Sequence, residues 1–181
     1  MPISFQTLAD NYPRENFGSG PTHQCAVRMS RCLSAAAPAF YQYLVECGIA
    51  KGMLLMPVGT HRYFRAAQQL ATLLSWEWGF QQSLSTGPMI AIGQGEVQAL
   101  RTHLAALQIP GGIIFLKNCF NRDRVSQEQA GVPTELIPRD GPGDHIELRY
   151  CTVPNLHHIR IMASPDLFRR ADEVWFWPCY S

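Results

Sequence analysis

The spacing of apolar residues changes along the chain, and this change limits the folds that the sequence can adopt. Up to about residue 108, apolar residues recur every three or four positions, as they do on one face of a helix. From Gly112 onward they form short runs of strand length or alternate with polar residues. Helices that come first and strands that come later predict an α+β fold with an antiparallel sheet, rather than alternating strand–helix units around a parallel sheet.

The same spacing gives the expected elements. After a helix-prone start at Phe5 and Leu8, we expect a helix that begins near residues 22–24 and runs to Ala37, followed by helices at Phe40–Cys47, Tyr63–Trp76 and Gly95–Gln108. The expected strands are Gly112–Lys117, His145–Cys151, His158–Ala163 and Val174–Pro178. The polar, Pro- and Gly-rich residues 119–143 predict a long loop, which in a compact domain is usually functional or mobile.

Composition excludes several classes of protein. The 181 residues carry a formal charge of +1, 46% of them are apolar and only 16% are charged. The chain is too apolar to be disordered, and it lacks the basic excess of a domain that binds nucleic acid. No apolar run approaches the roughly 18 residues that span a bilayer, so we expect no membrane insertion. At this length we expect a single domain over residues 1–181.

The six cysteines contain no CxxC pair, so their spacing fits neither a zinc ribbon nor a small disulfide scaffold. We expect most of them to be buried thiols, and we expect no metal or organic cofactor. A metal site around Cys151, His157 and His158 is a weak alternative, because these residues lack a known ligand spacing. The N-terminus has no cationic start followed by an apolar core, which argues against a secretory signal. The protein is therefore expected to stay in the cytoplasm or to leave it without a cleaved leader.

Two residues are candidates for catalysis. Cys25 follows a Gly- and Pro-containing loop at the predicted start of a helix, where unpaired N–H groups and the helix dipole stabilise a thiolate. The same N–H groups can hold an oxyanion. His145 opens a predicted strand after the long loop, so it can face a cleft and exchange protons with the thiol. The alternatives are one more buried thiol for Cys25 and a solvated surface histidine for His145.

These residues lie in motifs that resemble those of family four of the type VI secretion amidase effectors. Residues 25–30 (CAVRMS) resemble its CxxRMS nucleophile helix, and residues 143–148 (GDHIEL) resemble its GxHIxL block, about 120 residues later. Three other stretches agree in order: the segment around Arg62-Tyr63-Phe64, the strand at Gly112–Phe115 and the final Val174–Pro178. The resemblance spans most of residues 17–178.

The resemblance implies a papain-like fold of the NlpC/P60 type, in which the nucleophile helix packs on an antiparallel sheet. It also implies a peptidoglycan amidase that cleaves the bond between D-glutamate and meso-diaminopimelate in cell-wall peptide stems. Such proteins are interbacterial toxins, made in the cytoplasm and injected by the type VI secretion apparatus, without a signal peptide, into the periplasm of target bacteria. The producer makes a cognate immunity protein. By this resemblance Cys25 is the nucleophile and His145 the general base.

The third catalytic residue departs from the family pattern, which places an aspartate on the strand after the histidine strand. If a hairpin turns at Pro154-Asn155, Ser164 lies opposite His145, and a shifted register brings Asp166 there instead. We choose Asp166, because a carboxylate orients the ring and stabilises the imidazolium better than a hydroxyl does. Asp166 also fits a helix cap, and Ser164 or Asn155 stay open as alternatives.

Other residues near the motifs are expected to have structural roles. Gln24 is interpreted as a polar loop residue, although its amide could contact an oxyanion, and Arg28 as a structural hydrogen-bond donor. Asp144 is expected to face away from His145, because neighbouring strand residues alternate between faces. Trp175 and Trp177 are expected to share one face and to pack in the core.

Two further functions stay open at the level of the sequence. One is a papain-like cysteine peptidase or deamidase that acts on a protein substrate. The other is a catalytically inactive module that binds the cell wall, an alternative that the uncertain third catalytic residue motivates.

Overall fold

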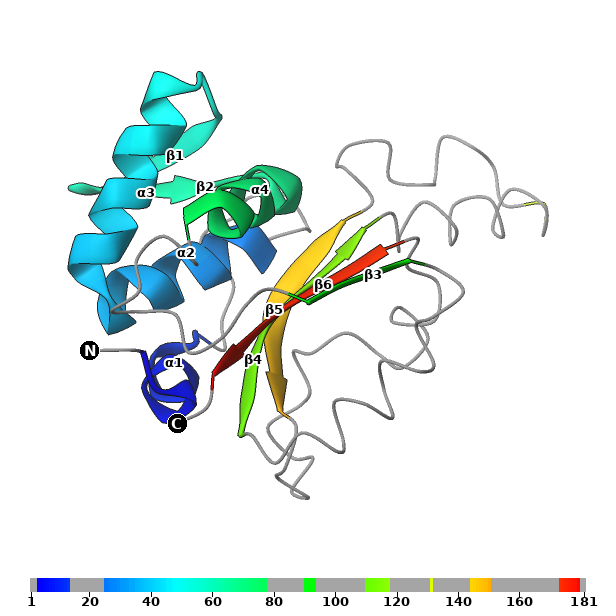
Figure 1. The fold of residues 1–181 in the computed structure, drawn as a ribbon. Helices are drawn as coiled ribbons and strands as arrows, with labels where there is room; N and C mark the ends of the chain where they lie inside the picture. The colour runs from blue at the N-terminus through cyan, green and yellow to red at the C-terminus, as the bar shows by residue number, and fades with distance from the viewer. Residues whose placement is uncertain are drawn as a thin grey trace.

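The computed structural model describes residues 3–13, 25–77, 90–93, 110–117, 131, 144–150 and 173–179. Their helices are α1 (Phe5–Asn11), α2 (Cys25–Ala36), α3 (Pro38–Ala50) and α4 (Ala67–Glu77). Their strands are β1 (Leu55–Val58), β2 (His61–Phe64), β3 (Ile90–Gly93), β4 (Gly111–Lys117), β5 (His145–Tyr150) and β6 (Glu173–Cys179). The fold is α+β, as predicted, and the helices lie to one side of the larger sheet (Figure 1).

The N-terminal helices form largely where the sequence predicts them. The Ser4 hydroxyl caps α1 by accepting a hydrogen bond from the Thr7 N–H at 3.1 Å. Phe5 and Leu8 bury the inner face of α1. The core face of α2 has the predicted three- and four-residue spacing. Its buried residues are Cys25, Ala26, Val27, Met29, Ser30, Cys32 and Leu33.

Helix α3 is longer than predicted at both ends. It begins at Pro38. The first N–H groups of a helix have no partner within the helix, so a proline there, which has no N–H, costs no hydrogen bond. It also continues through Gly48 to Ala50. A Cβ atom at Gly48 would lie 2.8 Å from the Phe64 ring, so this glycine lets α3 approach β2 closely instead of ending the helix.

The prediction of a helix from Tyr63 to Trp76 is wrong at its start. Residues 55–64 form an antiparallel hairpin in which Val58 pairs with His61, so the turn holds two residues. Its first residue, Gly59, has φ +61°, the left-handed conformation that such turns require. Tyr63 and Phe64 belong to β2, and α4 begins only at Ala67. Phe64 happens to continue the helical spacing of α4, which explains the error.

The larger sheet has the order β3-β6-β4-β5, and each neighbouring pair is antiparallel. The strands predicted at Gly112–Lys117, His145–Cys151 and Val174–Pro178 are confirmed as β4, β5 and β6 to within a residue at either end. Strand β3 was not predicted. The expected helix Gly95–Gln108 and strand His158–Ala163 lie outside the described residues, as does the expected loop 119–143 apart from Gly131.

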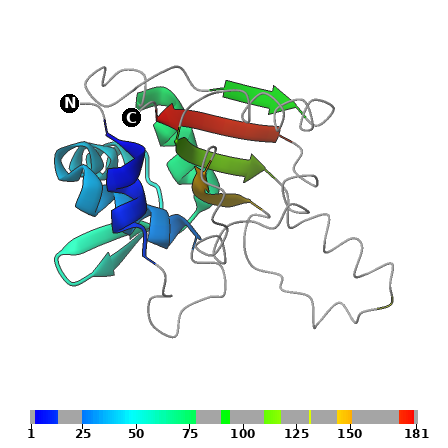
Figure 2. The same cartoon turned by 90° about the horizontal axis from the view of Figure 1, so that it is seen from below.

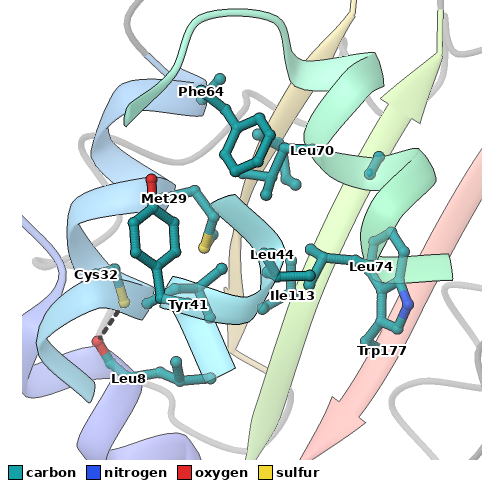
Figure 3. Close-up of a cluster of buried hydrophobic side chains, with 14 of the residues drawn as sticks. Leu8, Met29, Cys32, Tyr41, Leu44, Phe64, Leu70, Leu74, Ile113 and Trp177 are labelled. Atoms are coloured by element: carbon teal, nitrogen blue, oxygen red, sulfur yellow. Dashed lines mark hydrogen bonds between the residues drawn. The ribbon is translucent and has the colours of Figure 1, made fainter. Parts of the chain in front are cut away.

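The core lies between the helices and the sheet, which Figure 2 shows side by side. Leu44 of α3, Leu74 of α4, Ile113 of β4 and Trp177 of β6 are fully buried and meet there (Figure 3). The Cys32 thiol donates a hydrogen bond to the Leu8 carbonyl at 3.2 Å and ties α1 to α2. This packing holds the start of α2 against β5.

Ser30, the last residue of the CxxRMS motif, has a structural role. It is fully buried, and its Oγ accepts a hydrogen bond from the Phe64 N–H at 3.0 Å. The Tyr41 hydroxyl donates to the Arg62 carbonyl at 2.6 Å. Strand β2 is therefore fixed to both α2 and α3.

Candidate active site

The fold brings together the two residues that the sequence singles out. Cys25 is the first residue of α2 and His145 is the first residue of β5, and α2 packs on β5. Both side chains are buried, with residue exposures of 5% and 7%. The Cys25 thiol forms a hydrogen bond with the His145 ring. Two residues 120 positions apart in the sequence thus form one buried pair.

The environment of Cys25 favours the thiolate. Burial alone raises the pKa of the thiol, but other contacts outweigh it, so that the pKa is lowered overall. The hydrogen bond to His145 and the charge of that ring contribute most, followed by the backbone N–H of Ile146 and the guanidinium of Arg28. These are the contacts that convert a cysteine into a nucleophile at neutral pH.

The environment of His145 favours the imidazolium. Burial lowers the pKa of the ring, yet hydrogen bonds to Cys25 and Glu147 and the negative charges of both raise it to about 10. The lowered pKa of the thiol and the raised pKa of the imidazole both favour transfer of the proton from Cys25 to His145. Both shifts favour the thiolate–imidazolium form of the pair.

Glu147 is a partner of His145 that sequence reasoning missed. Its Oε2 lies 2.9 Å from Nε2 of His145, and the two side chains are only 4% and 9% exposed. This contact holds the imidazole ring beside Glu147. The signal was present in the sequence, since residues two apart on a strand share a face. The spacing His-x-Glu on a predicted strand therefore places a carboxylate beside the imidazole.

The expected third residue cannot be placed. Asp166 and its alternatives Ser164 and Asn155 lie outside the described residues, as does Gln24, so these assignments stay predictions. The function for which Asp166 was chosen, a carboxylate on the imidazole, is filled by Glu147.

The tryptophans of β6 have the expected structural role. Trp177 is fully buried and Trp175 packs against the core, and their rings form a T-shaped pair at a centroid distance of 6.3 Å. Trp76 differs, because it is 54% exposed and the Lys51 ammonium lies 4.7 Å from its ring centroid.

Four cysteines are described, and all four are free. Cys25, Cys32 and Cys179 are buried as expected, whereas Cys47 is half-buried. Among the described residues no cluster of three His, Cys, Asp or Glu side chains could hold a metal ion. Cys151, His157 and His158 lie outside those residues.

A separate groove of about 420 Å³ lies between α3 and the β1–β2 hairpin. It is lined by Ser34, Pro38, Tyr41, Gln42, Val45, Ile49, Thr60, His61 and Arg62. Neither Cys25 nor His145 borders it, so the groove is not part of the candidate active site.

No helix in the described part of the chain is long and apolar enough to cross a membrane. No family model, no curated protein and no solved structure matches this chain.

Proposed function

We propose that this protein is a cysteine hydrolase of papain-like architecture that cleaves an amide bond. The observation that carries the proposal is the buried pair of Cys25 at the start of α2 and His145 at the start of β5. A nucleophile held against a base, with the base held by a third group, is the arrangement that covalent catalysis requires. The contact between Glu147 and His145 Nε2 supplies that third group.

The chemistry follows from the charges of the pair. The Cys25 thiolate attacks the carbonyl carbon of the amide, and the N–H groups at the start of α2 hold the oxygen as it becomes negative. When the C–N bond breaks, the His145 imidazolium gives its proton to the departing amine. The neutral ring then takes a proton from water, and the hydroxide attacks the thioester. Breaking the C–S bond restores the thiolate and releases a carboxylate.

We further propose, from the CxxRMS and GxHIxL resemblance, that the substrate is the D-glutamyl–meso-diaminopimelate bond of peptidoglycan stems. The same resemblance supports an interbacterial toxin that the type VI secretion apparatus delivers to the periplasm of target bacteria. In that setting the producing cell needs a cognate immunity protein as a partner.

The direct test is digestion of purified muropeptides, with mass spectrometry of the products. Cys25→Ala is expected to abolish cleavage. Cys47→Ala is the matched control, because it removes a half-buried helical cysteine away from the site and is expected to cleave as the wild type does. Cleavage that survives Cys25→Ala refutes the mechanism.

The two other functions left open by the sequence give different outcomes. Release of peptides or of ammonia from a protein, with intact muropeptides, identifies a peptidase or deamidase. Binding to sacculi without any product identifies an inactive module. The Glu147 contact removes the reason for which the inactive module was considered, since the imidazole has a carboxylate partner.

A further inference from the structure

The candidate active site buries more negative than positive charge. In the thiolate–imidazolium form that the pKa shifts favour, two negative groups, Cys25 and Glu147, contact one imidazolium, and all three side chains are buried. These three groups taken alone carry one net negative charge in a region of low dielectric, which is costly unless a cation lies near. Asp144, the residue before β5, is buried too.

Arg28 is the cation that the fold brings to this site. It lies three residues after Cys25 on α2, so both side chains project from the same face of the helix. Helix α2 packs on β5, the strand that carries His145 and Glu147. The guanidinium interacts electrostatically with Cys25 and with the Tyr12 hydroxyl, and its Nε atom is buried.

Tyr12 connects Arg28 to the carboxylate side of the site. It follows the last residue of α1, and its hydroxyl oxygen is buried. Arg28, Glu147 and Cys25 all act on this hydroxyl electrostatically, so the four groups form one cluster. Burial holds the pKa of Tyr12 well above its ordinary value, and the phenol therefore stays neutral. With the imidazolium of His145 added, the cluster contains two cations and two anions.

We propose that Arg28 is a positioning residue of the reaction, the cation that balances the thiolate and the Glu147 carboxylate, and that Tyr12 fills the space between Arg28 and Glu147. The inference rests on the proposed role of Cys25 as nucleophile. It replaces the sequence-based interpretation of Arg28 as a donor with a purely structural role.

The test measures the pKa of the Cys25 thiol from the pH dependence of its alkylation by iodoacetamide, with peptide mapping to isolate Cys25. Arg28→Gln keeps the length and polarity of the side chain but removes the charge, and is expected to raise this pKa by about one unit. Arg28→Lys keeps the charge and is expected to stay near the wild-type value. The control is Arg31→Gln, an exposed arginine on the next turn, which is expected to change nothing.

A double variant separates charge balance from mere structural support. Glu147→Gln alone is expected to lower the thiol pKa, because it removes a negative charge. Combined with Arg28→Gln, it is expected to bring the thiol pKa back toward the wild-type value. The inference is overturned if Arg28→Gln leaves the pKa unchanged, or if the double variant lies no closer to the wild type than Arg28→Gln does.

The outcome does not depend on whether every variant folds or acts on the proposed substrate. If Arg28→Gln fails to give a cooperative thermal transition, Glu147→Gln alone decides, and an unchanged thiol pKa in that variant overturns the inference. Alkylation requires no peptidoglycan. If the proposed substrate is wrong, the wild type leaves muropeptides uncleaved, but the pKa of its Cys25 thiol is still low.

Discussion

Replacing Glu147 with Gln is the perturbation whose effect on the imidazole can be estimated most directly. The Nε2–Oε2 distance is 2.9 Å, and a glutamine oxygen can still accept this hydrogen bond, so the ring keeps its orientation and loses only its counter-charge. Unit charges about 4 Å apart interact by about 4 kcal/mol at an effective dielectric of 20. That energy corresponds to a pKa change of at most about three units. We expect the imidazolium pKa of His145 to fall by two to three units, on the order of that limit.

The pKa is measured by NMR titration of the His145 ring, with the exposed His61 as an internal reference. The same shift has a consequence for stability. In the folded protein the pKa of His145, about 10, lies above the free value of 6.5, so the charged ring stabilises the fold. This contribution is complete below pH 6.5 and is lost as the pH rises through 10.

In Glu147→Gln the contribution is smaller and disappears at a lower pH. The wild type is therefore expected to exceed the variant in free energy of unfolding at pH 6, and the difference is expected to shrink toward pH 10. A His145 pKa that moves by less than half a unit would refute the assignment of Glu147 as its partner.

Three further predictions follow from the described contacts. Ser30→Ala leaves the buried Phe64 N–H without its acceptor and is expected to cost about 1–3 kcal/mol in urea denaturation; an unchanged midpoint contradicts this role. Gly48→Ala gains about 1 kcal/mol of helix propensity but forces a methyl group against the buried Phe64 ring, so a net loss of stability is expected, and a more stable variant argues against the close approach. In the wild type, iodoacetamide is expected to alkylate Cys25 at a pH below the ordinary thiol pKa of about 8.5, and an alkylation profile centred on that value contradicts a lowered Cys25 pKa.

The sequence predicts the parts of this fold in which local and long-range preferences agree. Residues 25–36 have apolar spacing on one face only, so their helix follows directly, with a predicted start near residues 22–24 and an observed start at Cys25. The run Gly111–Lys117 is buried on both faces, and its continuous apolar character identifies it as an interior strand. His145 is recognisable because it opens an alternating segment after a Gly- and Pro-rich stretch.

Other features depend on tertiary contacts that a single segment does not contain. The role of Gly48 is set by the ring of Phe64, which approaches from β2, so a glycine that resembles a helix end is an interior residue. Polar and apolar residues alternate in the segment that contains Glu147, which is typical of a strand with one face in solvent, yet Glu147 is buried. The His-x-Glu spacing places the two side chains on the same face, but only the structure shows that both are buried.

The nucleophile and its base are supplied by opposite halves of the chain, and this separation has a consequence for biosynthesis. A ribosome completes α2 long before it reaches β5, and until the two meet, Cys25 is an ordinary thiol with a pKa of about 8.5. In the unfinished polypeptide Cys25 therefore lacks the contacts that lower its pKa. These contacts arise only with the finished tertiary structure, so the proposed catalysis by Cys25 begins only after synthesis is complete.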